Sequence, residues 1–268
     1  MPVPSHPHVP LTRRRALAAL TLFALPVALG ARSAAVGDHA PARPHWDYAA
    51  DGPDHWADLD RRFLACRMGH QQSPIDLPRH TPLDPADHLT FAYGPLPAVA
   101  LADNGHTLHA AVPADSGYHI TLDGRRYALT QFHFHTPSEH TIDRAGTAME
   151  LHLVHTDARG ALAVVAVLMR IGPAPSAFLP LFAEMPPTGG TRTVGPIDLR
   201  DFLPGDHAQF RYAGSLTTPP CTEGVSWTVL RRPVAVSAPE AERFRARFPH
   251  SNRPTQPRYD RPVLLAGG

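Results

Sequence analysis

The sequence contains no lysine, and arginine supplies all 25 of its basic residues. These residues balance 24 acidic ones, so the net charge is only +1. No stripe of basic residues alternates with aromatic ones, which argues against nucleic acid as a partner. Beyond residue 40 the chain of 268 residues also lacks internal repeats, low-complexity tracts and linkers. These absences indicate one mainly β domain over residues 40–265.

The sequence has no convincing membrane span near its N-terminus. The apolar run Ala16–Leu29 covers about 14 residues, which is too short to cross a bilayer comfortably. It follows the arginines Arg13–Arg15 and precedes small residues around Ala31, as in bacterial export signals. We therefore expect residues 1–35 to be a cleaved signal peptide, and the mature protein to be periplasmic or secreted without a stable membrane span. The paired arginines suggest the twin-arginine export route, and Sec export stays open.

Cysteine is nearly absent as well, because Cys66 and Cys221 are the only two. An exported protein meets an oxidising compartment, in which disulfides form and persist. A bond between the two residues would close a loop of roughly 150 residues, which stabilises a fold by on the order of 4–5 kcal/mol in the chain-entropy model. Two free thiols are the alternative, and the export signal favours the disulfide.

Histidine, in contrast, is placed with the period of a β-strand. In the segment Gln131–His135, His133 and His135 alternate with two phenylalanines. Because successive side chains of a strand point to opposite faces, Gln131 and the two histidines share one face. A lone His-x-His on a strand is more often two polar side chains than a metal site. Here Gln131 can accept the N–H of a neighbouring ring and fix its orientation, which favours the metal site.

A second segment, Glu150–Val154, repeats this design with Glu150 and His152 on one face. Turn residues between positions 136 and 149 allow the two strands to return antiparallel, which brings His152 beside the first pair. Three neutral imidazoles with an open position describe a catalytic zinc site, whereas structural sites use four protein ligands. The sequence thus predicts one Zn²⁺ bound by His133, His135 and His152, with Gln131 and Glu150 orienting the rings.

Several other short segments carry strand and turn signals. The expected strands are Leu89–Tyr93, Val99–Ala102, Thr107–Val112, His119–Leu122, Tyr127–Phe134, Ala161–Ile171, Phe210–Tyr212 and Val225–Leu230. The run Ala161–Ile171 has the continuous apolar character of a strand that is buried on both faces. Short helices are expected near Trp56–Leu64 and within Pro173–Pro187, and Pro239–Phe248 is the sustained helical candidate.

Ordered blocks along the chain resemble the α-class carbonic anhydrases of the bacterial, exported kind. The blocks are Trp46–Tyr48, Gly52–Trp56, Gln72–Ile75, Asn104–His106, Gln131–His135, Pro137–Thr141, Glu150–His155, Tyr212–Cys221 and Asn252–Pro254. The resemblance implies a mainly β, single domain built on a large twisted, mostly antiparallel (mixed) sheet of about ten strands with a few short helices. It also implies zinc at the base of a conical cavity, and a disulfide between Cys66 and Cys221.

The implied activity is that of a carbonate dehydratase, a zinc lyase that reversibly hydrates carbon dioxide to bicarbonate and a proton. Zinc lowers the pKa of a bound water toward neutrality, an effect for which carbonic anhydrases are themselves the reference case, and the resulting hydroxide attacks the substrate. By resemblance, the Oγ atom of Thr217 accepts a hydrogen bond from this hydroxide and donates its own hydrogen bond to Glu139. Glu139 is then expected to be ionised and to act only as an acceptor.

The resemblance also identifies a route for the proton that the reaction releases. His106 matches the family's proton shuttle, a role that suits histidine because its unperturbed pKa near 6.5 lies close to that of the metal-bound water. Tyr48 and Asn104 match residues that order the connecting waters. His109 matches no family position with assurance, and both a second proton relay and a polar wall are open for it.

An apolar pocket for carbon dioxide is implied on the opposite side of the metal. The substrate-binding residues are Val154, Val164, Leu216, Thr217, Thr218, Val225 and Trp227. His140 and His155 match buried structural histidines and not ligands. Sulfonamides or small anions are expected as inhibitors, and a monomer or a homodimer as the assembly.

Two other functions compete with this interpretation. A catalytically silent, carbonic-anhydrase-like binding module typically lacks one or more zinc histidines, whereas His133, His135 and His152 are all present. A zinc hydrolase of another fold would carry a His-Glu-x-x-His motif on a helix, and the sequence has none.

Overall fold

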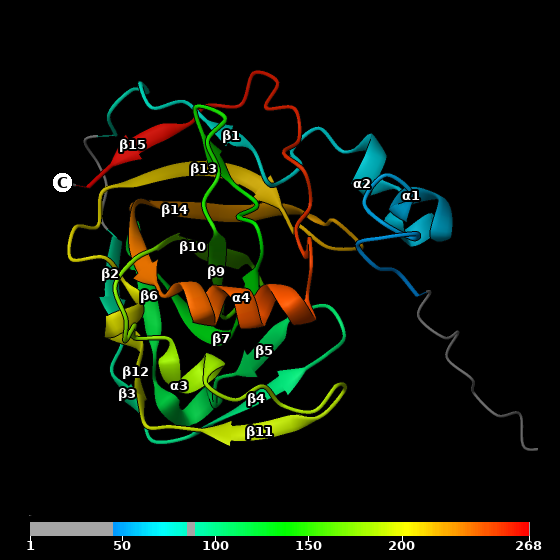
Figure 1. The fold of residues 1–268 in the computed structure, drawn as a ribbon. Coiled ribbons are helices and arrows are strands. Elements are labelled where there is room, and N and C mark those ends of the chain that lie inside the picture. The colour runs from blue at the N-terminus through cyan, green and yellow to red at the C-terminus, as the bar shows by residue number, and fades with distance from the viewer. Residues whose placement is uncertain (1–44, 85–88, 268) are drawn as a thin grey trace, which may run out of the picture. The chain divides into compact units, whose positions relative to one another are not determined.

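The computed structural model describes residues 45–84 and 89–267 (Figure 1). The predicted signal peptide, residues 1–35, and the first residues of the predicted domain, 40–44, lie outside the described residues. The main element of the described chain is a sheet of 11 strands. Its path in space runs through β11 (Thr191–Val194), β4 (Val99–Asp103), β5 (Leu108–Ala111), β7 (Arg125–His135), β9 (Met149–Thr156), β10 (Leu162–Ile171), β14 (Glu223–Val236), β13 (Gln209–Ser215) and β15 (Leu264–Ala266).

Two further strands branch from β7, because β6 (His119–Leu122) pairs with it and β2 (Leu89–Ala92) pairs with β6. All neighbouring strands of this sheet are antiparallel except β10 and β14, which are parallel. The predicted fold class, a large and mostly antiparallel mixed sheet, is confirmed. Two small sheets lie outside it and pair β1 (Asp76–Leu77) with β8 (Thr141–Ile142), and β3 (Pro95–Leu96) with β12 (Ile197–Asp198).

The helices of the described residues are short. They are α1 (Trp56–Leu59), η1 (Arg61–Phe63), α2 (Ala65–Met68), η2 (Ala114–Ser116), α3 (Leu179–Phe182), η3 (Leu199–Phe202) and α4 (Ala238–Arg247). The helix predicted near Trp56–Leu64 is divided, because Asp60 has an extended backbone and caps η1 with its side chain. None of the helices described is both long and apolar enough to cross a membrane.

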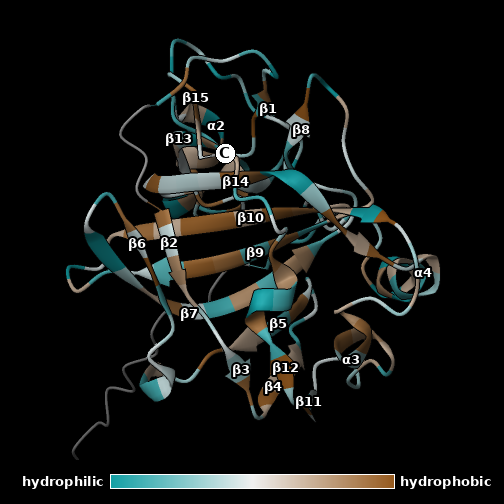
Figure 2. Ribbon diagram, turned by 90° about the vertical axis from the view of Figure 1, so that its left-hand side faces the viewer, coloured by the Kyte–Doolittle hydropathy of each residue, from teal (hydrophilic) through white to brown (hydrophobic). Residues whose placement is uncertain are grey.

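The main sheet buries different side chains on its two faces. Phe132 and Leu151 belong to the larger apolar core on one face. Val154 belongs to a second apolar cluster on the other face, as the alternation of side chains along a strand requires. Strand β10 contributes to both clusters through Val165 and Val164, which confirms the prediction of a strand buried on both sides. Figure 2 shows β9 and β10 as apolar along most of their length.

Helix α4 packs against the back of strand β7 (Figure 1). It begins with a capping box at Ser237. The rings of Phe244 on α4 and Phe134 on β7 lie 6.1 Å apart between centroids. Because Phe134 stands between His133 and His135, its ring points away from the face that carries the histidines. The helix therefore supports the strand that presents both candidate ligands.

A disulfide joins the N-terminal part of the described chain to the loop between β13 and β14. Cys66 and Cys221 are bonded across 155 residues of sequence, with their Cα atoms 5.0 Å apart, so the predicted pair is confirmed. Both cysteines lie in a third apolar cluster with Trp56, and Trp46 and Tyr48 pack against it. This cluster holds the aromatic residues of the N-terminal segment beside the loop that follows β4.

Candidate metal centre

Three histidines come together on one face of strands β7 and β9. His133 lies directly opposite His152 in the antiparallel register, and His135 is two residues further along β7. The ring centroids are 4.9 Å apart for His133 and His135, 5.1 Å for His133 and His152, and 4.6 Å for His135 and His152. One nitrogen from each ring lies within 4.8 Å of the other two. The sheet thus assembles the three predicted ligands through strand pairing alone.

The outer nitrogens of two of these rings are held by neighbouring side chains. His133 Nδ1 lies 2.8 Å from Gln131 Oε1, and His152 Nε2 lies 2.7 Å from Glu150 Oε1. Because amide and carboxylate oxygens only accept hydrogen bonds, each of these ring nitrogens carries the proton and donates it. The opposite nitrogens, His133 Nε2 and His152 Nδ1, therefore keep their lone pairs.

The third ring is held by the backbone. His135 Nδ1 donates to the carbonyl oxygen of Ser251 across 2.6 Å, so His135 Nε2 has the lone pair. This Nε2 atom is buried and has no hydrogen-bond partner among the described residues. A buried polar atom without a partner is uncommon in native proteins, and a lone pair in this position suits a metal ion. No sequence pattern points to Ser251, because its contribution is a main-chain carbonyl.

The environment of His133 and His135 favours the neutral rings that metal ligation requires. Burial and the nearby rings of His135 and His152 lower the pKa of His133 well below its ordinary value. Burial also lowers the pKa of His135, and Glu139 only partly opposes this. Neutral imidazole nitrogens are ligands that Zn²⁺ prefers. The donor set, its protonation and the unpartnered Nε2 atom all fit a zinc ion.

Glu150 is the buried acceptor that ties this cluster together. Its Oε1 accepts from the rings of His140 and His152, each at 2.7 Å, and its Oε2 accepts from the backbone N–H groups of Glu139 and His140, each at 2.8 Å. Burial raises the pKa of Glu150, but His140 and His152 outweigh it and hold the pKa well below the ordinary value. Nε2 of His140 lies 2.7 Å from the hydroxyl of Tyr212. Both ring nitrogens of His140 are therefore engaged, so it is no candidate ligand.

Residues 51–266 match the family model for eukaryotic-type carbonic anhydrase. The chain belongs to the α-carbonic anhydrase family. It is similar to a carbonic anhydrase of Klebsiella pneumoniae, with 41% identity over 226 residues that cover 82% of this chain and 90% of that protein. A carbonic anhydrase of Neisseria gonorrhoeae is 38% identical over 253 residues, which cover 93% of this chain and 98% of that protein.

Solved structures of carbonic anhydrases resemble this chain over most of its length. The α-carbonic anhydrase from Thermovibrio ammonificans, solved with the inhibitor sulfanilamide, has a TM-score of 0.78 and 35% identity and covers 83% of this chain and 99% of its own. An α-carbonic anhydrase of Photobacterium profundum has a TM-score of 0.75 and 37% identity, covering 82% and 100%. The predicted family and the enzyme class of carbonate dehydratase are confirmed.

In this carbonic anhydrase the predicted pair of Thr217 and Glu139 is buried but not hydrogen bonded. Thr217 is 5% exposed and Glu139 is 2% exposed. Oε1 of Glu139 accepts from the backbone N–H of Arg253 across 2.8 Å. Its Oε2 is buried without a hydrogen-bond partner among the described residues. One carboxylate oxygen is thus available, and the bond to Thr217 stays a prediction.

The predicted shuttle, His106, stacks on an aromatic side chain. Its ring lies 3.9 Å from that of Trp46 with an interplanar angle of 7°, and 6.5 Å from the ring of Tyr48. Burial and the neighbouring His45 lower the pKa of His106, and Asp47 partly opposes them. Burial raises the pKa of Tyr48 well above its ordinary value, with Glu139 adding to the effect. Tyr48 is therefore a neutral phenol.

Asn104 and His109 occupy different positions relative to the cluster. Oδ1 of Asn104 accepts from the backbone N–H groups of His106 and Thr107, at 3.0 and 2.9 Å, so this side chain shapes the shuttle loop. His109 lies directly opposite His133 in the register of β5 and β7 and shares its face of the sheet. It is partly buried, and this burial lowers its pKa. His109 thus lies beside the cluster, and the choice between polar wall and second proton relay stays open.

The residues predicted to hold carbon dioxide gather on the other side of His152. Val154, Val164, Val225 and Trp227 are buried in one apolar cluster, and Leu216 packs against it. The rings of Trp227 and His152 lie 5.0 Å apart. Thr218 is partly exposed beside Thr217. The apolar residues therefore flank the histidine cluster on one side, as His109 does on the other.

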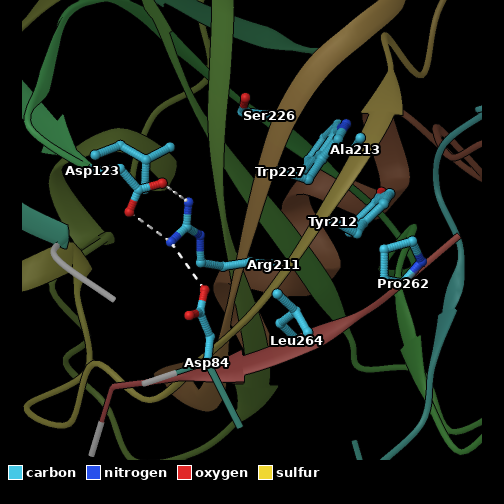
Figure 3. A pocket seen from close by; sticks show the side chains of 10 residues that line it. Asp84, Asp123, Arg211, Tyr212, Ala213, Ser226, Trp227, Pro262 and Leu264 are labelled. Carbon is cyan, nitrogen blue, oxygen red and sulfur yellow. Dashed lines mark hydrogen bonds and ion pairs between the residues drawn. The ribbon is translucent and has the colours of Figure 1, made fainter. Parts of the chain in front are cut away.

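A separate pocket of about 370 Å³ lies around Arg211 (Figure 3). Its guanidinium forms two hydrogen bonds to Asp123, at 3.0 and 2.5 Å, and an ion pair of 3.7 Å with Asp84. Trp227 and Tyr212 also line this pocket. None of the three candidate ligands does, so the pocket is not part of the metal centre of this carbonic anhydrase.

Proposed function

We propose that this carbonic anhydrase reversibly hydrates carbon dioxide with one Zn²⁺ held by His133 Nε2, His135 Nε2 and His152 Nδ1. The observation that carries the proposal is the convergence of three imidazole nitrogens within 4.8 Å, each left with a lone pair by the acceptor on the other side of its ring. When bound, zinc would supply a hydroxide nucleophile at neutral pH in the one coordination position that the three histidines leave open.

The ligands determine how much positive charge the bound ion would keep, and the acceptors behind them determine how the rings are oriented. Three neutral rings leave the charge of the ion undiminished, whereas a carboxylate or thiolate ligand would donate negative charge. Gln131, Ser251 and Glu150 each accept one ring N–H and so fix the tautomer and the orientation of the ring. The protein therefore prepares the ligand geometry before the metal binds.

Thr217 orients the nucleophile in this proposal, and Glu139 orients Thr217. The buried Oε2 of Glu139 has no hydrogen-bond partner among the residues described, and the hydroxyl of Thr217 is the proposed donor to it. A carboxylate accepts and cannot donate, so the hydroxyl of Thr217 donates its hydrogen bond to Glu139 and its oxygen lone pair accepts a hydrogen bond from the nucleophile. With its proton directed at Thr217 in this way, the nucleophile has a lone pair that points at the substrate carbon.

His106 carries the product proton to buffer in this proposal. Its imidazole is partly exposed and is held against Trp46, so one side of the ring can exchange protons with solvent. Transfer is efficient when the pKa of the relay lies near that of the donor, which histidine provides. Tyr48, a neutral phenol whose ring lies 6.5 Å from that of His106, is the proposed support for connecting waters.

Carbon dioxide is a neutral, apolar molecule and gains little from hydrogen bonds before it reacts. The buried side chains of Val154, Val164 and Trp227 beside His152 offer the apolar surface proposed to hold it. Sulfonamides and small anions are the proposed inhibitors, since they compete for the open position of the metal. The structure of the Thermovibrio ammonificans relative with sulfanilamide supports this class of inhibitor.

We also propose that the protein works outside the cytoplasm, in the periplasm or after secretion. The disulfide between Cys66 and Cys221 supports this location, because such bonds persist in oxidising compartments. The export signal expected over residues 1–35 supports it as well.

The proposal is tested by stopped-flow hydration of carbon dioxide and metal analysis of the same samples. The wild type is expected to be active with one zinc per chain. His135→Ala is expected to lose zinc and activity together, and His80→Ala, at an exposed position, to keep both. A wild type that holds zinc but does not hydrate carbon dioxide would instead support the catalytically silent binding module.

A further inference from the structure

The loop that carries His106 is built around two side chains that replace backbone hydrogen bonds. Oδ1 of Asp103 accepts from the N–H of Gly105 at 2.9 Å, and Asn104 accepts from the two N–H groups that follow. Gly105 has a φ of +85°, which only glycine adopts without strain. The shape of this loop therefore depends on where the carboxylate of Asp103 is held.

Asp103 is held by an arginine from a distant element. Its side chain is 1% exposed, and its Oδ2 accepts from Nη1 of Arg247 at 2.6 Å, across 144 residues of sequence. An isolated carboxylate is costly to bury, and the ion pair with this guanidinium offsets that cost. Arg247 is the last residue of α4, and its position is set by the packing of that helix against β7.

Arg247 also fastens a second segment to the same point. Its Nη1 donates to Oγ1 of Thr188 at 2.9 Å and approaches the carbonyl oxygen of Pro186 at 3.4 Å. The backbone N–H of Asp103 donates to the carbonyl oxygen of Gly190 at 2.9 Å. One guanidinium thus joins the end of β4, the segment before β11 and the end of α4.

We propose that Arg247 is a positioning residue for proton transfer, acting through Asp103 on the loop that presents His106. The proposal rests on the function proposed above. Proton relay depends steeply on geometry, and a displacement of about 1 Å costs as much as 100-fold in other reactions of positioned groups. Stacking on Trp46 fixes the ring of His106, but the backbone beneath it is fixed by the ion pair between Arg247 and Asp103.

The kinetic test separates proton transfer from hydration in Arg247→Gln, Arg247→Lys and the control Arg243→Gln. Arg243 is exposed on the same helix, so its replacement is expected to change nothing. In dilute buffer, Arg247→Gln is expected to lower kcat about tenfold while kcat/KM stays within about twofold. Arg247→Lys keeps a cation and is expected to recover most of kcat, and added imidazole to restore Arg247→Gln. If Arg247 had only a structural role, Arg247→Gln would lower the melting temperature and leave the ratio of kcat to kcat/KM as it is in the wild type.

A second measurement does not depend on catalysis. The amide of Gly105 is hydrogen bonded to Asp103, so its hydrogen exchange reports whether the loop is held. We expect exchange at this amide to be at least about tenfold faster in Arg247→Gln than in the wild type or Arg243→Gln. An inactive wild type would refute the proposed function, whereas unchanged exchange at Gly105 would refute the positioning role.

Asp103→Asn provides the test if Arg247→Gln does not fold. Its amide oxygen can still accept from Gly105, but the charge that binds Arg247 is gone. A loss of kcat without a loss of kcat/KM is expected here too. A folded Asp103→Asn with the kcat of the wild type would overturn the proposal.

Discussion

Replacing Glu150 by glutamine removes one charge from the centre of the ligand network without changing its size. The carboxylate accepts four hydrogen bonds, two from the rings of His140 and His152 and two from backbone N–H groups. A glutamine can accept on only one side, because its other terminal atom is a donor. Each of the two orientations of the amide therefore breaks a different pair of hydrogen bonds in the network.

If the amide nitrogen faces the rings, His152 Nε2 has to accept, and its proton moves to Nδ1. That nitrogen is the one proposed to bind the metal, so the tautomer needed for ligation is lost. If the amide nitrogen faces the backbone, the N–H groups of Glu139 and His140 lose their acceptor. Each buried donor left without a partner costs about 1–3 kcal/mol, so the free energy of unfolding is expected to fall by about 2–6 kcal/mol.

The affinity for zinc is expected to fall by about 10- to 100-fold, a range that draws in part on carbonic anhydrases themselves. This corresponds to about 1.4–2.8 kcal/mol of binding free energy. The assay is competition for zinc against a chelator of known affinity. Glu240→Gln is the matched control, because Glu240 is 1% exposed and accepts hydrogen bonds within the cap of α4. It is expected to destabilise the fold and leave zinc affinity unchanged. If Glu150→Gln held zinc within about twofold of the wild type, the orienting role of the carboxylate would be refuted.

His106→Ala is expected to keep zinc and to lower kcat in dilute buffer, and added imidazole should partly restore it; no response to imidazole would show that another group carries the proton. Burial lowers the pKa of His155 to about 3. The contribution of this histidine to the free energy of unfolding is therefore fully present above about pH 6.5 and is lost as the pH falls toward 3. In urea unfolding, His155→Gln should reduce the loss of stability below pH 6.5 by about 1.4 kcal/mol per pH unit, and an unchanged pH dependence would contradict this. Replacing Cys66 and Cys221 together by alanine is expected to cost on the order of 4–5 kcal/mol of unfolding free energy, and an unaltered urea midpoint would contradict the chain-entropy account.

The sequence revealed the parts of this protein that depend on local alternation. The pattern of Gln131–His135 and Glu150–Val154 predicts which side chains share a face, and strand pairing then brings the three histidines together. Strand β10 was predicted from its continuous apolar run, and the central part of β14, Val225–Leu230, from its general strand signal. The two-residue strands β1, β3, β8 and β12 are too short to show a period, and β11 and β15 carry little more signal.

The parts that sequence could not reveal depend on backbone atoms or on distant pairing. Ser251 contributes its carbonyl to His135, and any residue type can supply a carbonyl. Arg247 and Asp103 meet across 144 residues, and no local pattern relates them. Asn104 was predicted as a contact for ordered waters, and the structure shows an additional role in the loop backbone. Such features become visible only when the sheet and α4 are in place.

The proposed activity requires a single metal ion held by His133, His135 and His152, and a zinc titration tests this most directly. Zinc is removed from the purified protein with a chelator, its absence is verified, and zinc is then added in steps while hydration of carbon dioxide is measured. We predict no activity without zinc and a linear rise that ends at one equivalent per chain. Hydration by the verified zinc-free protein would contradict the account.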